Sequence, residues 1–275
     1  MEGIVAEISV LQWPWAVFSW EKHVLRHDLL DAFDAHMRPD NFKDYCPNGL
    51  QVEGRQEIRT LVSGVTASRA LIETAVEQGA DAIVVHHGLF WRGQDGTVTG
   101  WMKERLKRLL AHDINLFAYH LPLDVHPEVG NNTQLAKLLG IKVRRGLEPW
   151  NSKSVAMVGK LEEPMSGADF AKLIAERLGR EPLYCGDTGP ELIRSVAWCT
   201  GGGQSYVNLA AEQGIDAFIS GEASEQTIHT AREMGMHFYA AGHHATERYG
   251  VKALGEWLAT VHGLEVTFID IDNPV

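Results

Sequence analysis

The stretch VEQGADAIVVHH at residues 76–87 recurs as AEQGIDAFISGE at residues 211–222, with five of the twelve positions identical. In both copies a helical segment ends at a glycine, which can take the left-handed conformation of a helix C-cap. A short apolar run follows, as expected for a buried strand. The repeat therefore predicts a helix followed by a strand at two distant places in the chain.

The segments around each copy extend this pattern. Strand candidates precede the two copies at residues 60–65 (TLVSGV) and 193–200 (IRSVAWCT). A helix and a strand follow each copy, at residues 101–110 and 115–120 in the first half and at residues 226–234 and 237–241 in the second. The order strand-helix-strand-helix-strand is typical of α/β proteins with mainly parallel strands. We expect a three-layer α/β fold with two similar halves, and we favour internal duplication over convergent helix-glycine-strand order.

The expected organisation has three parts: an N-terminal extension at residues 1–23, a first α/β half at 24–150 and a second half at 151–275, whose C-terminal part closes onto the first around the site. The segments at 148–151 (EPWN) and 181–190 are connections.

The N-terminal extension is largely apolar from residue 8 to residue 20 and contains Trp13, Trp15 and Trp20. This run is too short to span a bilayer. It lacks a basic leading segment and is interrupted by Pro14, so a secretory signal is not indicated. We expect an arm that packs on the protein surface or on a neighbouring subunit.

Composition narrows the class of protein. Hydrophobic residues at 45% and charged residues at 22% are ordinary for a globular protein. The formal charge of -11 disfavours phosphate backbones as partners. The basic run Lys103, Arg105, Lys107 and Arg108 is interpreted as the solvated face of a helix. The three cysteines form no CxxC pair, which indicates neither a zinc knuckle nor a disulfide framework and favours the cytoplasm.

Metal-ligating side chains follow several of the predicted strands. In α/β sheets, ligands bind beyond the carboxyl ends of the strands. The last strand of the second half runs into GHHATER, which places His243 and Glu247 four residues apart and on one helix face. The candidate ligands at these strand ends are His86, His87, Asp124, His243 and Glu247.

Five such side chains exceed what one ion in an open site requires, so the set predicts two ions with a bridging carboxylate. Without a thiolate nearby, Zn, Mn, Fe or Co fits and Cu(I) does not. The spacing leaves a simpler interpretation open, because histidine pairs also occur without metals. Glu247 could instead be an acid favoured by the helix dipole.

Five longer motifs resemble those of the dinuclear-metal family of GTP cyclohydrolase I type 2 homologues. They are CPNGLQVEG (46–54), VVHHGLFW (84–91), YHLPLDVHPEVGNN (119–132), SGEASEQTIHTARE (220–233) and GHHATER (242–248). The resemblance covers about residues 25–275, in the compact form without an inserted domain. It implies that His86, His87, Asp124, His243 and Glu247 bind two divalent or trivalent metal ions per subunit. It also implies a toroidal homohexamer with the metal sites facing an internal cavity.

Other polar residues of these motifs are candidates for supporting roles. His120, His126, Asn131 and Asn48 could orient the ligands or contact a substrate, since metal-bound imidazoles usually donate their other nitrogen to a partner. Turn or cap formation is the alternative for each. The glycines at 201–203 could bind an anion through backbone amides or simply form a turn.

Glu222 occupies the place of His87 in the repeat, which predicts that its carboxylate lies at the rim of the same cavity. It could act there as a catalytic acid or base. Its alternative role is to cap the helix expected at residues 224–234.

These features together predict a metal-dependent hydrolase of a nucleotide-like or other small polar substrate, because two adjacent ions can activate water. Two other classes stay open at this point: a ring-shaped nucleic-acid-binding protein and a metal storage or delivery protein.

Overall fold

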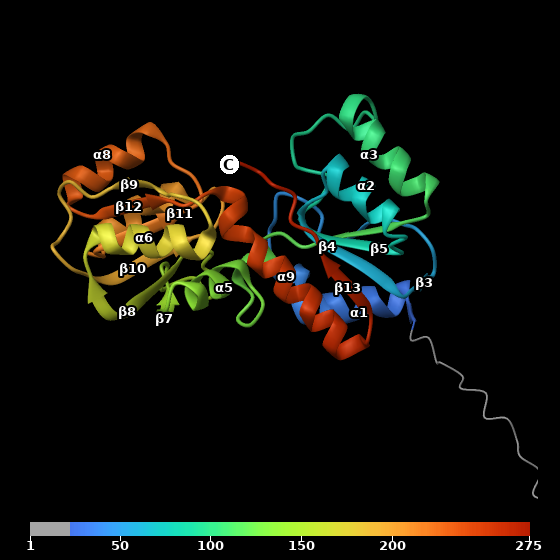
Figure 1. Cartoon of the computed structure of the whole chain (residues 1–275), viewed down its shortest axis with the longest axis horizontal. Coiled ribbons are helices and arrows are strands. Elements are labelled where there is room, and N and C mark those ends of the chain that lie inside the picture. The colour runs from blue at the N-terminus through green and yellow to red at the C-terminus, as the bar shows by residue number, and fades with distance from the viewer. Residues whose placement is uncertain (1–22) are drawn as a thin grey trace, which may run out of the picture.

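The computed structural model describes residues 23–275 and consists of two lobes, each built around one β-sheet (Figure 1). The arm expected at the N-terminus lies outside the described residues, apart from His23. Among the helices of residues 23–275, none combines the length and apolar character needed to cross a membrane.

Within residues 23–275, the first sheet has five strands, of which only β2 is antiparallel to its neighbour. In spatial order these are β13 (Glu265–Phe268), β4 (Thr60–Thr66), β5 (Ala82–His87), β6 (Asn115–Ala118) and β2 (Gly49–Val52). A short antiparallel ribbon lies beside this sheet and consists of β1 (Val24–Leu25) and β3 (Glu57–Ile58).

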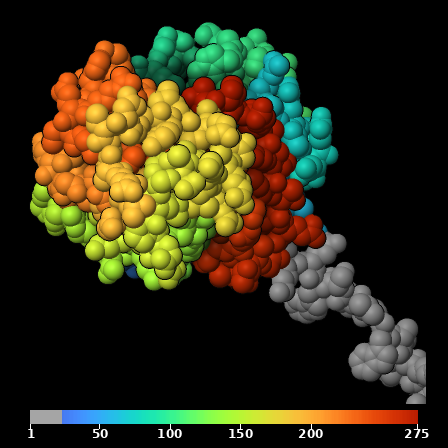
Figure 2. Space-filling model, turned by 60° about the vertical axis from the view of Figure 1, so that its left-hand side comes forward, coloured from blue at the N-terminus to red at the C-terminus, as the bar shows by residue number. Residues whose placement is uncertain are grey.

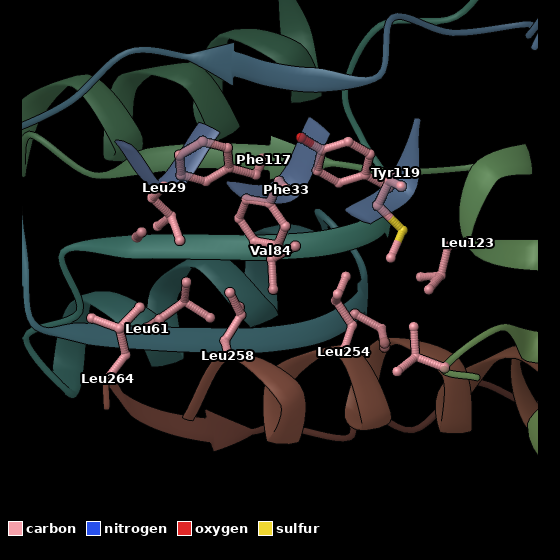
Figure 3. Packing of buried hydrophobic residues seen from close by; sticks show 14 of the residues in the cluster. Leu29, Phe33, Leu61, Val84, Phe117, Tyr119, Leu123, Leu254, Leu258 and Leu264 are labelled. Carbon is pink, nitrogen blue, oxygen red and sulfur yellow. The ribbon is translucent and has the colours of Figure 1, made fainter. Parts of the chain in front are cut away.

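Two layers of helices cover the first sheet. One face packs against α2 (Arg69–Glu77) and α3 (Gly100–Ala111), and the other against α1 (Arg26–Met37) and α9 (His243–His262). Because successive side chains of a strand point to opposite faces, Ile83 and Val85 join the α2/α3 cluster while Val84 joins the α1/α9 cluster. Figure 3 shows the α1/α9 cluster, in which side chains of these two helices pack together on the sheet.

In the described part of the chain, the second sheet has six strands, with parallel strands at its centre and antiparallel strands at its edges. In spatial order these are β7 (Ile141–Gly146), β8 (Met157–Met165), β10 (Ile193–Cys199), β11 (Ala217–Ser220), β12 (His237–Ala240) and β9 (Leu183–Cys185). One face packs against α5 (Asn131–Leu138) and α6 (Gly167–Leu178), and the other against α7 (Val207–Glu212) and α8 (Glu225–Met234).

The predicted α/β class with mainly parallel strands is confirmed. The units β4-α2-β5-α3-β6 and β10-α7-β11-α8-β12 follow the predicted order, and Gly79 and Gly214 end their helices at φ +65° and +67°. The aspartates of the repeat also make matching bonds. Oδ2 of Asp81 accepts from two backbone amides at the start of β4, at 2.8 and 3.0 Å, and Oδ2 of Asp216 accepts from two at the start of β10, at 2.9 and 2.8 Å. This shared detail supports duplication.

The two lobes exchange elements at their ends. Strand β7 precedes residue 150 yet pairs in the second sheet, and β13 at the C-terminal end pairs in the first. Helix α9 begins beside the second sheet and runs across the first, so the red C-terminal segment lies between the lobes in Figure 2. The division near residue 150 stays a prediction.

Candidate metal centre

The five candidate ligands lie together at the junction of the lobes. His86 and His87 end β5, and Asp124 lies in α4 (Leu121–Val125), the short helix that follows β6. His243 and Glu247 lie in the first two turns of α9. Because β5 and β6 are parallel, their carboxyl ends share one edge of the sheet, and the start of α9 lies at that edge.

The carboxylate of Glu247 lies between two groups of donors. Its Oε1 atom is 3.5 Å from Nε2 of His86, which is 3.4 Å from Oδ1 of Asp124. Its Oε2 atom is 3.3 Å from Nε2 of His87 and 3.1 Å from Nε2 of His243. The cluster therefore divides into an inner group of His86, Asp124 and Glu247 and an outer group of His87, His243 and Glu247. Within each group the ligand atoms lie within 4.8 Å of one another.

Each histidine of the cluster has its second ring nitrogen engaged. Nδ1 of His86 lies 3.1 Å from the carbonyl oxygen of Tyr119, and Nδ1 of His87 lies 3.2 Å from Oγ1 of Thr66. Nδ1 of His243 lies 2.6 Å from Oε1 of Glu222. Such outer contacts fix the ring orientation of metal-bound histidines. Here they direct three Nε2 atoms toward Glu247.

The inner group is almost completely buried, with His86 at 0%, Glu247 at 3% and Asp124 at 7% exposure. Burial raises the pKa of Asp124. Burial alone would also raise the pKa of Glu247, but the rings of His86 and His87 hold it well below its usual range. Burial alone would lower the pKa of His86, but Asp124 and Glu247 raise it to about 9. These directions mean that a proton on His86 offsets carboxylate charge in the cluster, and Nε2 would have to release that proton to bind a cation.

One buried oxygen shows that the cluster is not satisfied by protein groups alone. Within residues 23–275, Oε2 of Glu247 accepts no well-formed hydrogen bond. Buried polar atoms without partners are costly and uncommon. A cation beside Glu247 would remove this cost, so the residues present fit metal ions.

The glycine loop after β10 packs against the cluster. Gly201 has φ +62°, its amide donates to Oγ1 of Thr246 at 3.0 Å, and a Cβ on it would lie 2.0 Å from Oε1 of Glu247. The first of the three glycines at 201–203 is thus needed to leave room for the central carboxylate.

The residues predicted to support the ligands or contact a substrate have different surroundings in the structure. Nδ2 of Asn131 donates to Oδ1 of Asp124 at 2.8 Å. His126 lines a neighbouring cavity, and its Nδ1 accepts from the amides of Glu128 and Val129, as in a turn. Oδ1 of Asn48 accepts from the amide of His120 at 2.7 Å.

Glu222 lies behind His243. Its carboxylate contacts Nδ1 of that ring, whereas α8 is capped by Ser224, which forms a capping box with Thr227. Helix capping by Glu222 is therefore not needed.

Sequence reasoning missed Asp44, whose side chain is only 3% exposed. Its Oδ1 atom lies 2.7 Å from Nδ1 of His120, and its Oδ2 atom accepts from Nδ2 of Asn48 and from the amide of Leu121, both at 2.9 Å. Asp44 precedes the CPNGLQVEG motif by two residues and carries no periodic signal. Only its burial and its bonds reveal it.

A cavity of about 990 Å³ opens onto the cluster. His87, His120, Asp124, His243 and Glu247 line its inner part. Aromatic side chains and two lysines line the rest, namely Phe42, Tyr45, Trp91, Tyr206, Lys43 and Lys153. The donors are therefore accessible to a small molecule from one side.

Comparison with known proteins matches this architecture to one family. The family model described as Duf34/NIF3 (NGG1p interacting factor 3) matches residues 24–274. The chain belongs to the DUF34/NIF3 family. The resemblance inferred from the motifs is confirmed, because curated members share the name it implied.

Two curated members of the DUF34/NIF3 family show the extent of the similarity. A protein of Haemophilus influenzae is 58% identical over 247 residues, which cover 90% of this chain and 98% of that protein. One of Escherichia coli K12 is 60% identical over 231 residues, covering 84% and 92%. Both are named GTP cyclohydrolase 1 type 2 homolog.

Solved structures agree with the family assignment. Protein ybgI, described as of unknown function, superposes with a TM-score of 0.88 at 55% identity and covers 92% of this chain and 100% of its own. A crystal structure from Thermus thermophilus gives 0.83 at 33% identity, with the same coverage.

Proposed function

We propose that this chain binds two metal ions and is a metal-dependent hydrolase. The observation that carries the proposal is the position of Glu247, whose two carboxylate oxygens face separate groups of donors. One ion would be held by His86, Asp124 and Glu247, and the other by His87, His243 and Glu247. The carboxylate of Glu247 would bridge them.

Two metal ions in such a site polarise a substrate and lower the pKa of water, which is the chemistry of hydrolysis. The side chains of the cluster are oriented and charged so that they could bind the two metal ions. Three Nε2 atoms are directed inward by their Nδ1 contacts, and Asp124 and Glu247 supply negative charge. Nδ2 of Asn131 holds the carboxylate of Asp124 in place.

The donor set favours Zn, Mn, Fe or Co, because it contains imidazole and carboxylate groups. Cys199 lines the same cavity, but burial raises the pKa of its thiol well above the usual range. A protonated thiol is a poor ligand. We therefore assign no sulfur ligand to the centre.

The substrate is proposed to be nucleotide-like or another small polar molecule. The names of the curated relatives point to a purine nucleotide, and the aromatic walls of the cavity suit a planar ring. Lys43 and Lys153 lie where they could meet an anionic group.

The rival classes gain less support. In the basic run on α3, Arg108 pairs with Glu73 and Glu104, and Arg105 stacks over Trp101. The two ion pairs of Arg108 reduce the positive charge that this run offers to a nucleic acid. A metal storage protein would have no need of a substrate cavity lined by aromatic residues.

We also propose a cytoplasmic homo-oligomer, with the toroidal hexamer implied by the family resemblance as its form. Light scattering tests this directly. A mass of 30.5 kDa at all concentrations would identify a monomer and contradict it.

The proposed function is tested by metal analysis of protein purified without chelators or added ions, followed by assays on a panel of hydrolase substrates. We expect about two ions per chain and turnover that is lost in Glu247→Gln, which keeps the shape of the side chain and removes its charge. Metal-free protein with undiminished turnover would contradict the proposal.

A further inference from the structure

Asp44 holds the ring of His120 in one orientation. The carboxylate lies between η1 (Pro39–Asn41) and β2 and accepts hydrogen bonds at both oxygens. Oδ1 meets the amide of Tyr45 at 2.6 Å and Nδ1 of His120 at 2.7 Å. Because carboxylates accept and do not donate when ionised, Nδ1 of His120 must carry the hydrogen.

The contact with Asp44 determines whether Nε2, the other ring nitrogen of His120, donates or accepts a hydrogen bond. In a neutral imidazole, one nitrogen carries the hydrogen and the other a lone pair. When the ring of His120 is neutral, Asp44 holds its hydrogen at Nδ1 and the lone pair lies at Nε2. His120 lines the cavity in front of the metal centre, so this acceptor is available to a bound molecule.

His120 lies beside the proposed ligands, and one of its ring nitrogens lies within 4.8 Å of ligand atoms of His86 and His87. The centroid of its ring is 5.1 Å from that of His86 and 5.8 Å from that of His87. Each proposed ligand histidine approaches a carboxylate oxygen of the cluster to 3.1–3.5 Å, whereas the carboxylate that His120 approaches is Asp44. The ring of Trp91 stands almost perpendicular to that of His120, with centroids 5.0 Å apart. The ring of His120 therefore lies between the candidate ligands His86 and His87 on one side and the ring of Trp91 on the other.

We propose that His120, oriented by Asp44, contacts the substrate by accepting a hydrogen bond at Nε2. The inference rests on the proposed function and narrows it: the substrate presents an N–H or O–H donor next to the atom bound at the metal centre. Amides, ring N–H groups and hydroxyl compounds belong to this class. A substrate whose corresponding atom bears only lone pairs would leave Nε2 without a donor.

The test uses cobalt-loaded full-length protein and two small chelating probes, acetohydroxamate and N-methylacetohydroxamate. The first has an N–H group beside its metal-binding oxygens, and the second has a methyl group there. Their dissociation constants are measured from changes in visible cobalt absorption. We expect the wild type to prefer acetohydroxamate by about three- to tenfold, as one hydrogen bond supplies.

Variants locate the origin of this preference. His120→Ala should abolish it while leaving two cobalt ions bound. Asp44→Asn leaves the ring in place but removes the carboxylate that selects its tautomer, so the preference should fall there too. His229→Gln, a change at an exposed histidine of α8, should keep the wild-type preference.

Two results would overturn the inference. A preference that persists in His120→Ala would show that the residue does not contact the probe, and loss of a cobalt ion in that variant would make His120 a metal ligand instead. A wild type that binds no cobalt would contradict the proposed function itself. Circular dichroism of each variant separates these results from misfolding.

Discussion

Oε1 of Glu222 lies 2.6 Å from Nδ1 of His243, while Nε2 of the same ring lies 3.1 Å from Glu247. Glu222, His243 and Glu247 therefore form a line from the surface to the centre of the cluster. A carboxylate behind a metal-facing imidazole orients the ring and increases its basicity. This places Glu222 in a supporting position, on the side of His243 that faces away from Glu247.

Glu222→Gln tests that role. The amide keeps the size of the side chain but removes the charge that acts on His243. We expect the weaker-bound metal ion to lose about 10- to 100-fold in affinity, as measured by competition with a chelating dye. If both ions stay bound with wild-type affinity but turnover is lost, Glu222 acts directly in catalysis instead.

Gly201→Ala should disrupt metal binding, because the added methyl group would displace the carboxylate of Glu247. The added Cβ would lie 2.0 Å from Oε1 of Glu247, and the residue would keep an unfavourable φ of +62°. Gly202→Ala is the matched control, since its Cβ would meet no atom closer than 3.9 Å. Metal content per folded chain should fall in the first variant and hold in the second. Equal metal content in both would mean that Glu247 does not depend on this contact.

The two metal positions should differ in lability. The side chains of the inner group are 0–11% exposed, whereas those of His87 and His243 are 16% and 29% exposed. The inner group also has a carboxylate of its own, Asp124. A chelator should therefore remove one ion first, and His243→Gln should retain close to one ion. Simultaneous loss of both ions during a timed chelation would argue against inequivalent positions.

A separate prediction concerns acid stability and His36, far from the proposed ligands in sequence. Its ring stacks on Trp257, with centroids 4.0 Å apart, and lies beside His126. Burial, and then the charge of His126, lower the pKa of His36 to about 4, although Glu128 opposes the shift. Because the unfolded chain holds this proton more tightly than the folded one, the contribution of His36 to stability is lost as pH falls from 6.5 toward 4.

His36→Phe keeps the stacked ring and removes the titration. Its free energy of unfolding, measured with urea on metal-free protein, should fall less between about pH 7 and pH 5 than that of the wild type. Parallel curves for the two proteins would show that another group is responsible.

Local patterns in the sequence were sufficient to predict the repeated helix-strand units. Gly79 and Gly214 end helices, and apolar runs follow them, so β5 and β11 are visible without any structure. The candidate ligands were also visible, because they lie at strand ends: His86 and His87 end β5, Asp124 follows β6, and Glu247 follows β12 of the other sheet.

The remaining features depend on contacts between distant segments. Strands β9 and β13 have only three and four residues, and β13 pairs with β4, which lies far earlier in the chain. No local signal selects such a partner. Asp44 and Thr66 were missed for the same reason, since each acts on a histidine brought close only by folding.

The central claim is that Glu247 bridges two metal ions, and anomalous X-ray diffraction from metal-loaded crystals tests it most directly. Two peaks about 3.5–4 Å apart are expected, one beside His86 and Asp124 and the other beside His87 and His243, with Glu247 between them. A single peak, or two peaks of which only one adjoins Glu247, would contradict the claim.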